Sequence, residues 1–334
     1  MSKTLKNAKF SVLDLSPIIE GSTAGAAFKN SLDLAQHAEK WGYNRYWVAE
    51  HHSMPGIASS ATSVLIGYIA GGTSKIRVGS GGIMLPNHAP LVIAEQFGTL
   101  ESLYPNRIDL GLGRAPGSDQ LTANALRRGG KRDGSDFPEM LEDLRQFLRP
   151  YEQTGLPVRA IPGEGLNIPI WLLGSSGFSA KLAAELGLPF AFASHFSSDY
   201  TIPALQTYHQ NFKPSKVLEK PYVMVGANII ISETEEKAQY LATSSQQQFL
   251  SLIRGRPTQM KPPVENMDEI WSPYERSVVQ QQLKSSIIGT QEIVAAKLEA
   301  FLKETQADEV IVNTALYSHQ ERLESFKLLK EIVM

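Results

Sequence analysis

The sequence contains no cysteine among its 334 residues. This absence excludes disulfide bonds, thiolate metal sites and a cysteine nucleophile, and it fits a reducing compartment. Positive charge is not in excess either, because the formal net charge is −2, so we expect no binding to nucleic acid. No apolar run approaches the roughly 20 residues that a membrane span needs, and the first residues lack the apolar stretch of a signal peptide. We therefore expect a soluble, cytoplasmic protein with no membrane partner.

What the sequence does contain is an alternation of short β-rich runs with amphipathic helical stretches. This pattern favours parallel strands joined by right-handed crossovers, and eight such strands close an α/β (β/α)8 TIM barrel. The competing fold, an open doubly wound sheet, usually shows a glycine-rich fingerprint after its first strand, and residues 16–20 are not one. We predict one barrel domain over residues 1–334, with strands at 10–15, 45–49, 76–80, 107–112, 170–173, 190–193, 223–231 and 309–313.

Two segments interrupt the alternation, after predicted strands four and seven. Residues 115–136 are rich in glycine, arginine and aspartate, and residues 254–273 are rich in proline. Insertions of this length within a compact domain tend to be functional covers or mobile segments. Residues 254–273 are therefore a candidate lid over the barrel mouth, and a disordered surface excursion is the alternative.

The carboxyl ends of the predicted strands carry polar or glycine clusters. Barrel enzymes place their active sites at these ends, so we expect residues far apart in the sequence to share one rim. The clusters are Glu50-His51-His52, Gly81-Gly82, Gly113-Arg114, Gly174-Ser175-Ser176-Gly177 and Ser194-His195.

His51 and His52 are adjacent, so at a strand end their side chains point in different directions and at most one faces a common site squarely. That one could act as a general base, because imidazole titrates near neutral pH. Alternatively both are hydrogen-bonded structural residues, with Glu50 as an orienting partner. No third ligand is fixed nearby in the sequence, so we predict no metal site.

The turn at residues 174–177 follows a strand and opens a helix. Exposed amides at that helix N-terminus, with two serine hydroxyls, could bind a phosphate, although serine and glycine are also common in such turns for conformational reasons. Arg114, one loop earlier around the ring, could add a fixed positive charge or make a salt bridge at the rim. The glycines at 79, 81 and 82 allow either the close approach of a planar ligand or a tight turn.

Three motifs occur in order at the expected strand ends, in residues 38–52, 78–86 and 111–114. Together they resemble the bacterial-luciferase-like family of flavin-dependent monooxygenases, in its single-chain, non-luminescent members. The resemblance implies a (β/α)8 barrel that binds FMN after a separate NAD(P)H:flavin reductase has reduced it. It also implies that O2 adds to the reduced ring, that a flavin hydroperoxide attacks a small organic substrate, and that the protein is a homodimer.

By motif position, the resemblance also implies a role for individual residues. His51 matches the histidine that acts as a base near the flavin, and Gly81 and Gly82 match a pair joined by a non-prolyl cis peptide beneath the isoalloxazine. Arg114 matches the arginine that binds the phosphate. The remaining residues assigned to cofactor binding are His52, Ser175, Ser176 and Gly177.

The chain departs from the luciferases at one position, because Gly113 stands where their catalytic subunit has a reactive cysteine. Nothing in the sequence supports light emission or a long-chain aldehyde substrate. Two other functions stay open: hydride transfer with a deazaflavin cofactor, which related barrels use, and flavin binding without turnover.

Overall fold

The alternation in the sequence folds into a closed ring of strands. The structure is a computed structural model, and it describes residues 3–115, 117–127 and 134–333. Within these residues, eight parallel strands pair side by side, and the last of them pairs with both the first and the seventh, which closes the barrel. The eight are β1 (Lys9–Asp14), β2 (Arg45–Val48), β3 (Arg77–Ser80), β5 (Ile108–Gly113), β6 (Ile170–Gly174), β7 (Phe190–Phe192), β8 (Val223–Ile231) and β10 (Glu309–Asn313).

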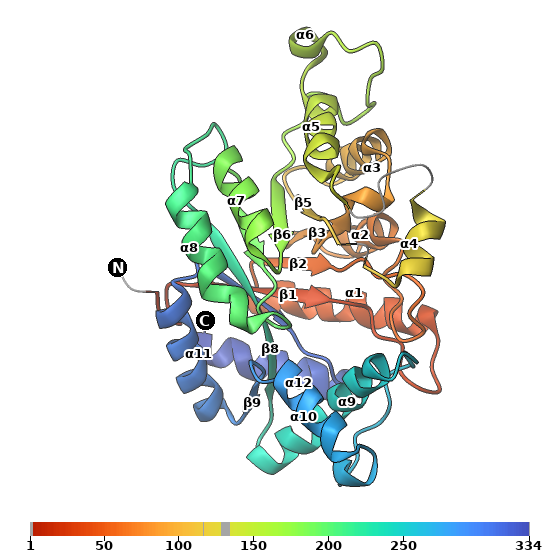
Figure 1. The fold of residues 1–334 in the computed structure, drawn as a ribbon, viewed down its shortest axis with the longest axis vertical. Helices are drawn as coiled ribbons and strands as arrows, with labels where there is room; N and C mark the ends of the chain where they lie inside the picture. The colour runs from red at the N-terminus through yellow and green to blue at the C-terminus, as the bar shows by residue number, and fades with distance from the viewer. Residues whose placement is uncertain (1–2, 116, 128–133, 334) are drawn as a thin grey trace.

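One helix after each barrel strand covers the outside of the ring (Figure 1). These helices are α1 (Ala24–Trp41), α2 (Thr62–Gly71), α3 (Pro90–Leu103), α5 (Phe137–Leu148), α7 (Gly177–Leu186), α8 (Thr201–Asn211), α11 (Gln291–Thr305) and α12 (His319–Val333). None of the helices in the described residues is both long enough and apolar enough to cross a membrane.

The predicted (β/α)8 barrel and both of its insertions are confirmed. The insertion after the fourth barrel strand holds α4 (Gln120–Leu126), while residues 116 and 128–133 of it lie outside the described residues. The insertion after β8 holds α9 (Glu235–Ile253), α10 (Pro273–Gln282) and the short strand β9 (Ile287–Gly289). Sequence reasoning did not identify these insertion helices, nor α6 (Tyr151–Thr154) and the two-residue strand β4 (Ile83–Met84).

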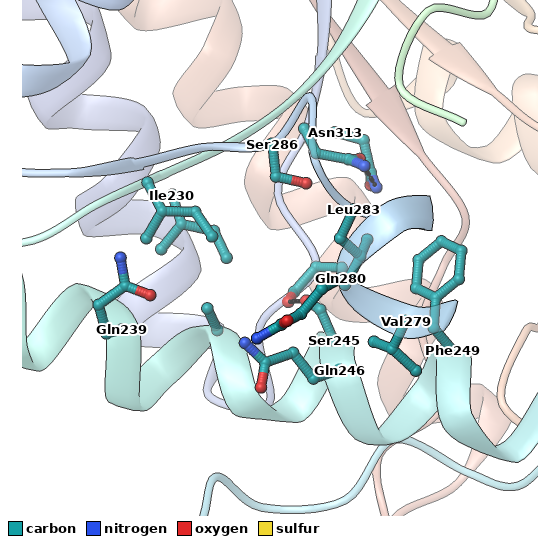
Figure 2. Close-up of a pocket in the computed structure, with 14 residues that line it drawn as sticks. Ile230, Gln239, Ser245, Gln246, Phe249, Val279, Gln280, Leu283, Ser286 and Asn313 are labelled. Carbon is teal, nitrogen blue, oxygen red and sulfur yellow. Dashed lines mark hydrogen bonds between the residues drawn. The ribbon is translucent and has the colours of Figure 1, made fainter. Parts of the chain in front are cut away.

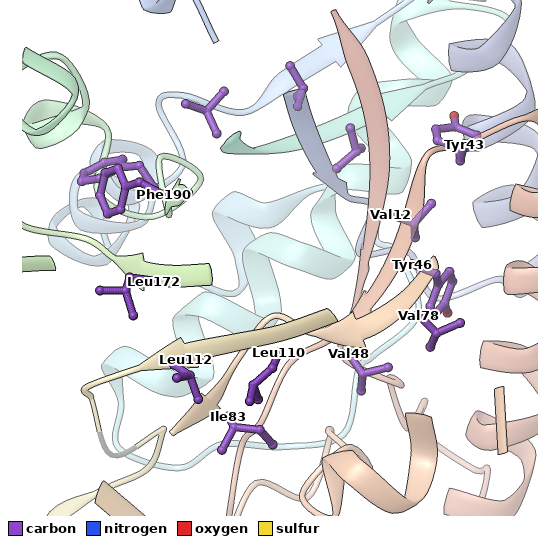
Figure 3. Close-up of a cluster of buried hydrophobic side chains, with 14 of the residues drawn as sticks. Val12, Tyr43, Tyr46, Val48, Val78, Ile83, Leu110, Leu112, Leu172 and Phe190 are labelled. Carbon is purple, nitrogen blue, oxygen red and sulfur yellow. The ribbon is translucent and has the colours of Figure 1, made fainter. Parts of the chain in front are cut away.

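The main hydrophobic core lies between the ring and its helices. Because side chains alternate along a strand, every second residue points outward. Val12, Val48, Val78, Leu110 and Leu172 are such residues, and all are buried in one continuous cluster that Figure 3 shows along the strands.

The alternate residues of the same strands fill the inside of the barrel in layers. At the amino-terminal end, Arg45 bridges Asp109 (2.6 Å) and Glu309 (2.8 Å), so buried charges are paired there. Above this layer, Trp47 and Trp171 pack edge to face with ring centroids 5.2 Å apart. These inward-facing side chains pack across the barrel below its carboxyl end.

Residues 254–273 pack against the loops that follow β1 and β2. The backbone of Met260 exchanges hydrogen bonds with Ile18 and Glu20, and Met260, Met267 and Trp271 are buried. The segment therefore lies across one side of the barrel mouth, as a cover would. Whether it opens as a lid stays a prediction.

Candidate active site

The floor of the barrel mouth is made by residues with no side chain or a small one. Ala49 and Gly81 continue the inward-facing rows of β2 and β3 above Trp47. A Cβ atom at Gly81 would lie 2.8 Å from Leu13 Cδ1 and 3.1 Å from Trp47 Cβ, so a side chain there would collide with the layer below. The peptide bond between Gly81 and Gly82 is cis. This strand end therefore presents bare backbone toward the mouth.

His51 is the inward-facing histidine of the pair. His51 follows Trp47 and Ala49 at intervals of two residues, the spacing of inward-facing side chains on this strand. Its Nδ1 is buried with no hydrogen-bond partner among the described residues. Burial lowers the pKa of His51, and this effect outweighs a hydrogen bond to the backbone of Gly117 and the nearby charge of Glu50. Burial thus favours the neutral form of His51 at the mouth.

His52 points away from the barrel interior, toward the carboxylate of Glu50. His52 Nε2 lies 2.8 Å from Glu50 Oε1, and His88 Nε2 lies 3.0 Å from both oxygens. Burial alone would raise the pKa of Glu50, but hydrogen bonds from His52, His88 and the Met84 N–H outweigh it and lower the pKa to about 2. Glu50 is therefore a buried carboxylate whose hydrogen bonds fix the loop that carries His51. Cofactor binding by His52 stays a prediction.

Arg114 lies beside the N-terminus of α7. Its guanidinium stacks on the ring of Phe178, 4.4 Å from the centroid, and Phe178 is the second residue of that helix. The structure thus brings the end of β5 and the start of α7 together, although their residues are far apart in the sequence.

The turn between β6 and α7 leaves its polar groups available. Ser176 is the N-cap of α7, makes no capping hydrogen bond with its side chain, and is exposed together with Gly177. Ser175 is half-buried, and its carbonyl accepts a hydrogen bond from the Ser197 hydroxyl at 3.0 Å. The first N–H groups of a helix lack partners within the helix and favour an anion. With Arg114 alongside, this corner of the rim can hold a phosphate.

His195 is a candidate that sequence reasoning placed on the rim without giving it a role. It follows Ala191 and Ala193 with the period of two that points inward, and its Nδ1 is buried without a partner among the described residues. A Cβ atom at Gly226 would lie 2.1 Å from this Nδ1, so the imidazole packs directly on the backbone of β8. Burial, with a smaller contribution from His51, lowers the pKa of His195 to about 4.

A short chain of amides holds the loop that carries His195. Asn228 Nδ2 donates to the His195 carbonyl at 3.0 Å, and Asn313 Nδ2 donates to Asn228 Oδ1 at 3.0 Å. Two neutral imidazoles therefore face the mouth from β2 and β7, each with an unpartnered nitrogen. Among the described residues, no group of three histidine, aspartate or glutamate side chains is arranged to hold a metal ion.

Comparison with known proteins finds relatives along nearly the whole chain. A family model described as luciferase-like monooxygenase matches residues 8–309. The luciferase-like monooxygenase of Escherichia coli (strain K12) is 56% identical over 329 residues, which are 98% of this chain and 98% of that protein. The N-acetyl-S-alkylcysteine monooxygenase of Bacillus subtilis (strain 168) is 35% identical and covers 98% of both chains.

Solved structures share the fold. The crystal structure of apo-MsnO8 is 33% identical, with a TM-score of 0.86 over 97% of this chain and 98% of that one. Two structures below 20% identity have a TM-score of 0.72 over at least 98% of both chains. One is the oxygenating constituent of the Pseudomonas putida 3,6-diketocamphane monooxygenase with FMN, and the other is an F420-dependent secondary alcohol dehydrogenase with an F420-acetone adduct. At that identity the likeness concerns the fold alone.

Proposed function

Because the chain belongs to the luciferase-like monooxygenase family, we propose that it uses reduced FMN and O2 to oxygenate a small organic substrate. One oxygen atom of O2 enters the substrate and the other leaves as water, with both electrons taken from the reduced flavin. The observation that carries the proposal is that Arg114 lies beside the N-terminus of α7. The same rim bears two buried imidazoles whose Nδ1 atoms have no partner among the described residues.

The residues present fit FMN at both of its ends. A phosphate would bind between Arg114 and the amides that open α7, because a cation and a helix N-terminus both stabilise an anion. A flat ring would lie over Gly81 and Gly82, where no side chain stands in the way. When bound, reduced FMN would supply the electrons that activate O2, and the packed layer of Trp47 and Trp171 below the mouth would limit the access of water from that side.

We assign the general base to His51. Its Nδ1 has no hydrogen-bond partner among the described residues, so a tautomer with the lone pair on Nδ1 would let it take up a proton at the mouth. Because burial lowers the pKa of His51 below 6.5, turnover should be insensitive to pH between 7 and 8 and should fall in acid as the imidazole becomes protonated. A pH profile of kcat/KM measures this fall in acid, and a profile that rises toward acid would contradict the assignment.

The experiment that tests the proposal is a titration of the protein with FMN, reduced FMN and the deazaflavin F420. Wild-type protein should bind reduced FMN most tightly, and Arg114→Ala should weaken that binding by about 1.5–3 kcal/mol, the usual contribution of a hydrogen bond to a charged group. His51→Ala should leave binding unchanged and slow turnover. Arg159→Ala is the matched control, because Arg159 is exposed and paired with Glu164 away from the mouth. Equal FMN affinity in Arg114→Ala and Arg159→Ala would refute the phosphate site.

The same titration separates the alternatives. Tighter binding of F420 than of reduced FMN would favour a deazaflavin-dependent hydride transfer, the function of one fold neighbour. Binding of reduced FMN with no product from any substrate would favour a flavin-binding protein without turnover. Organic sulfides are the first substrates to assay, because a relative at 35% identity is named for an S-alkylcysteine.

The proposal includes two partners. Reduced FMN would come from an NAD(P)H:flavin reductase, and we propose that both proteins lie in the cytoplasm, where NAD(P)H is available. The second partner is another copy of the chain, since α2 and α3 expose apolar side chains: Val64 (73% exposed), Tyr68 (45%) and Val92 (42%). A homodimer through this face should be visible in sedimentation equilibrium, and Val64→Lys should shift it toward monomer.

A further inference from the structure

The insertion after β8 encloses a cavity next to the barrel mouth. Ile230 packs with Leu241 and Ala242 of α9, so α9 covers the inner face of the β8 end. Residue 231, on the opposite face, donates its N–H to Ser325 of α12, which belongs to the outer layer. A cavity of about 230 Å³ lies between this inner face, α9 and α10, and we call it the α9–α10 pocket (Figure 2).

The α9–α10 pocket lies next to the loop that carries His195. Asn228 and Asn313 line it, and the same Asn228 donates its side-chain hydrogen bond to the carbonyl of His195. Figure 2 shows Asn313 and Ser286 at one end of the cavity, with Gln246 of α9 and Gln280 of α10 at the other. A molecule in the pocket would therefore have one end near the mouth and the other between the two insertion helices.

The lining of the α9–α10 pocket mixes apolar and uncharged polar side chains. Its polar side chains are carboxamides and hydroxyls, and no charged side chain of the described residues lines it. The carboxamides of Gln239, Gln246 and Gln280 make no hydrogen bond in the described part of the chain, so both their donors and their acceptors are available. Apolar walls are provided by Phe249 and Val279, among others.

We propose that the α9–α10 pocket binds the organic substrate and selects an uncharged molecule with an apolar part and a neutral hydrogen-bonding group. A charged ligand group that leaves water for this lining would find no opposite charge, so its binding is unfavourable. A neutral polar ligand group can instead exchange hydrogen bonds with the carboxamides of the lining, which both donate and accept. The volume suits a molecule with on the order of ten non-hydrogen atoms, since one water occupies about 30 Å³. This inference rests on the proposed function, because it names the substrate class of that site.

The test uses pairs of neutral and anionic compounds on one scaffold. N-acetyl-S-methylcysteine amide and the corresponding acid differ only in a carboxamide and a carboxylate, and further amide–acid pairs of similar size extend the panel. Binding is measured by saturation-transfer NMR and calorimetry, with and without FMN. The amides should bind at least tenfold more tightly than the acids. Equal or tighter binding of the acids would overturn the inference.

A positive charge placed in the pocket should remove this preference for amides. Gln280→Lys puts a cation in the lining, and because Gln280 is exposed on α10 the fold should tolerate it. The amide-to-acid affinity ratio should fall at least tenfold in this variant. Gln281→Lys adds the same charge at the next residue, which is exposed but does not line the pocket, and it should keep the wild-type ratio.

The outcomes separate this inference from the proposed function. If both lysine variants change the ratio alike, the substrate lies elsewhere and the inference fails. If no amide of the panel binds while reduced FMN still binds, the inference fails and the proposed function stands. If reduced FMN does not bind but the amides do, the proposed function fails and the pocket assignment stands.

Discussion

Replacing Glu50 by glutamine should destabilise the protein markedly at neutral pH, although the side chain keeps its shape. Glu50 is 1% exposed, and hydrogen bonds from His52, His88 and the Met84 N–H lower its pKa from 4.5 to about 2. At about 1.36 kcal/mol per unit of pKa, the charged form contributes about 3 kcal/mol to folding. Urea unfolding at pH 7, followed by tryptophan fluorescence, should show this loss in Glu50→Gln.

The pH dependence follows from the same lowered pKa. The contribution of Glu50 is fully present above pH 4.5, the pKa of the unfolded chain, and is lost as pH falls through the folded pKa near 2. The free energy of unfolding of the wild type should therefore decline more steeply between pH 4.5 and 2 than that of Glu50→Gln.

Glu275→Gln is the matched control for this substitution. The Glu275 pKa is also lowered to about 2, by a hydrogen bond from Arg254 and the Ser272 N–H, but this carboxylate is close to solvent and its ion pair is screened. Its replacement should change stability far less. Equal losses of unfolding free energy in Glu50→Gln and Glu275→Gln would refute the reasoning that burial makes the Glu50 network strong. The same conclusion would follow if the unfolding free energies of wild type and Glu50→Gln fell equally steeply between pH 4.5 and 2.

Three further substitutions have defined outcomes. Gly226→Ala would place a methyl group 2.1 Å from His195 Nδ1, so the imidazole must move. Turnover should fall at least tenfold while the circular dichroism spectrum stays unchanged. Full activity would contradict the packing of His195 on β8. Arg322→Met leaves Asp14 buried without its 2.8 Å ion pair and should cost about 3–5 kcal/mol in urea unfolding. Gly98→Ala would bring a methyl group within 2.2 Å of a facing backbone atom, so we expect a loss of about 1–3 kcal/mol; a calorimetric melting temperature equal to that of wild type would show that the backbone yields.

Local patterns were enough to predict the eight barrel strands. Each strand reads as a short β-rich run because one face is buried against helices and the other fills the barrel, as Val48 and Trp47 illustrate on β2. The insertion helices were harder to predict. Most of α10 is exposed and only Val279 is buried, so its apolar periodicity is weak.

The roles of the two adjacent histidines depended on contacts that the sequence does not contain. Period two predicts that His51 and His52 diverge, and the structure agrees. Which one faces the mouth follows from Glu50, whose carboxylate holds His52 from the outer side. Sequence reasoning placed His195 on the rim but gave it no role, because its packing against Gly226 on the next strand is a tertiary contact.

By itself the sequence determined the barrel and the family, and it predicted the rim on which we propose that the chemistry lies. Hydrophobic periodicity and motif spacing suffice for this because they are local properties of the chain. Only the tertiary structure decided that Arg114 meets the N-terminus of α7, that His195 packs on Gly226, and that an uncharged pocket lies between α9 and α10. Each of these is a contact between segments distant in the chain. Closure of the ring brings such segments together, and no local pattern records which of them will touch.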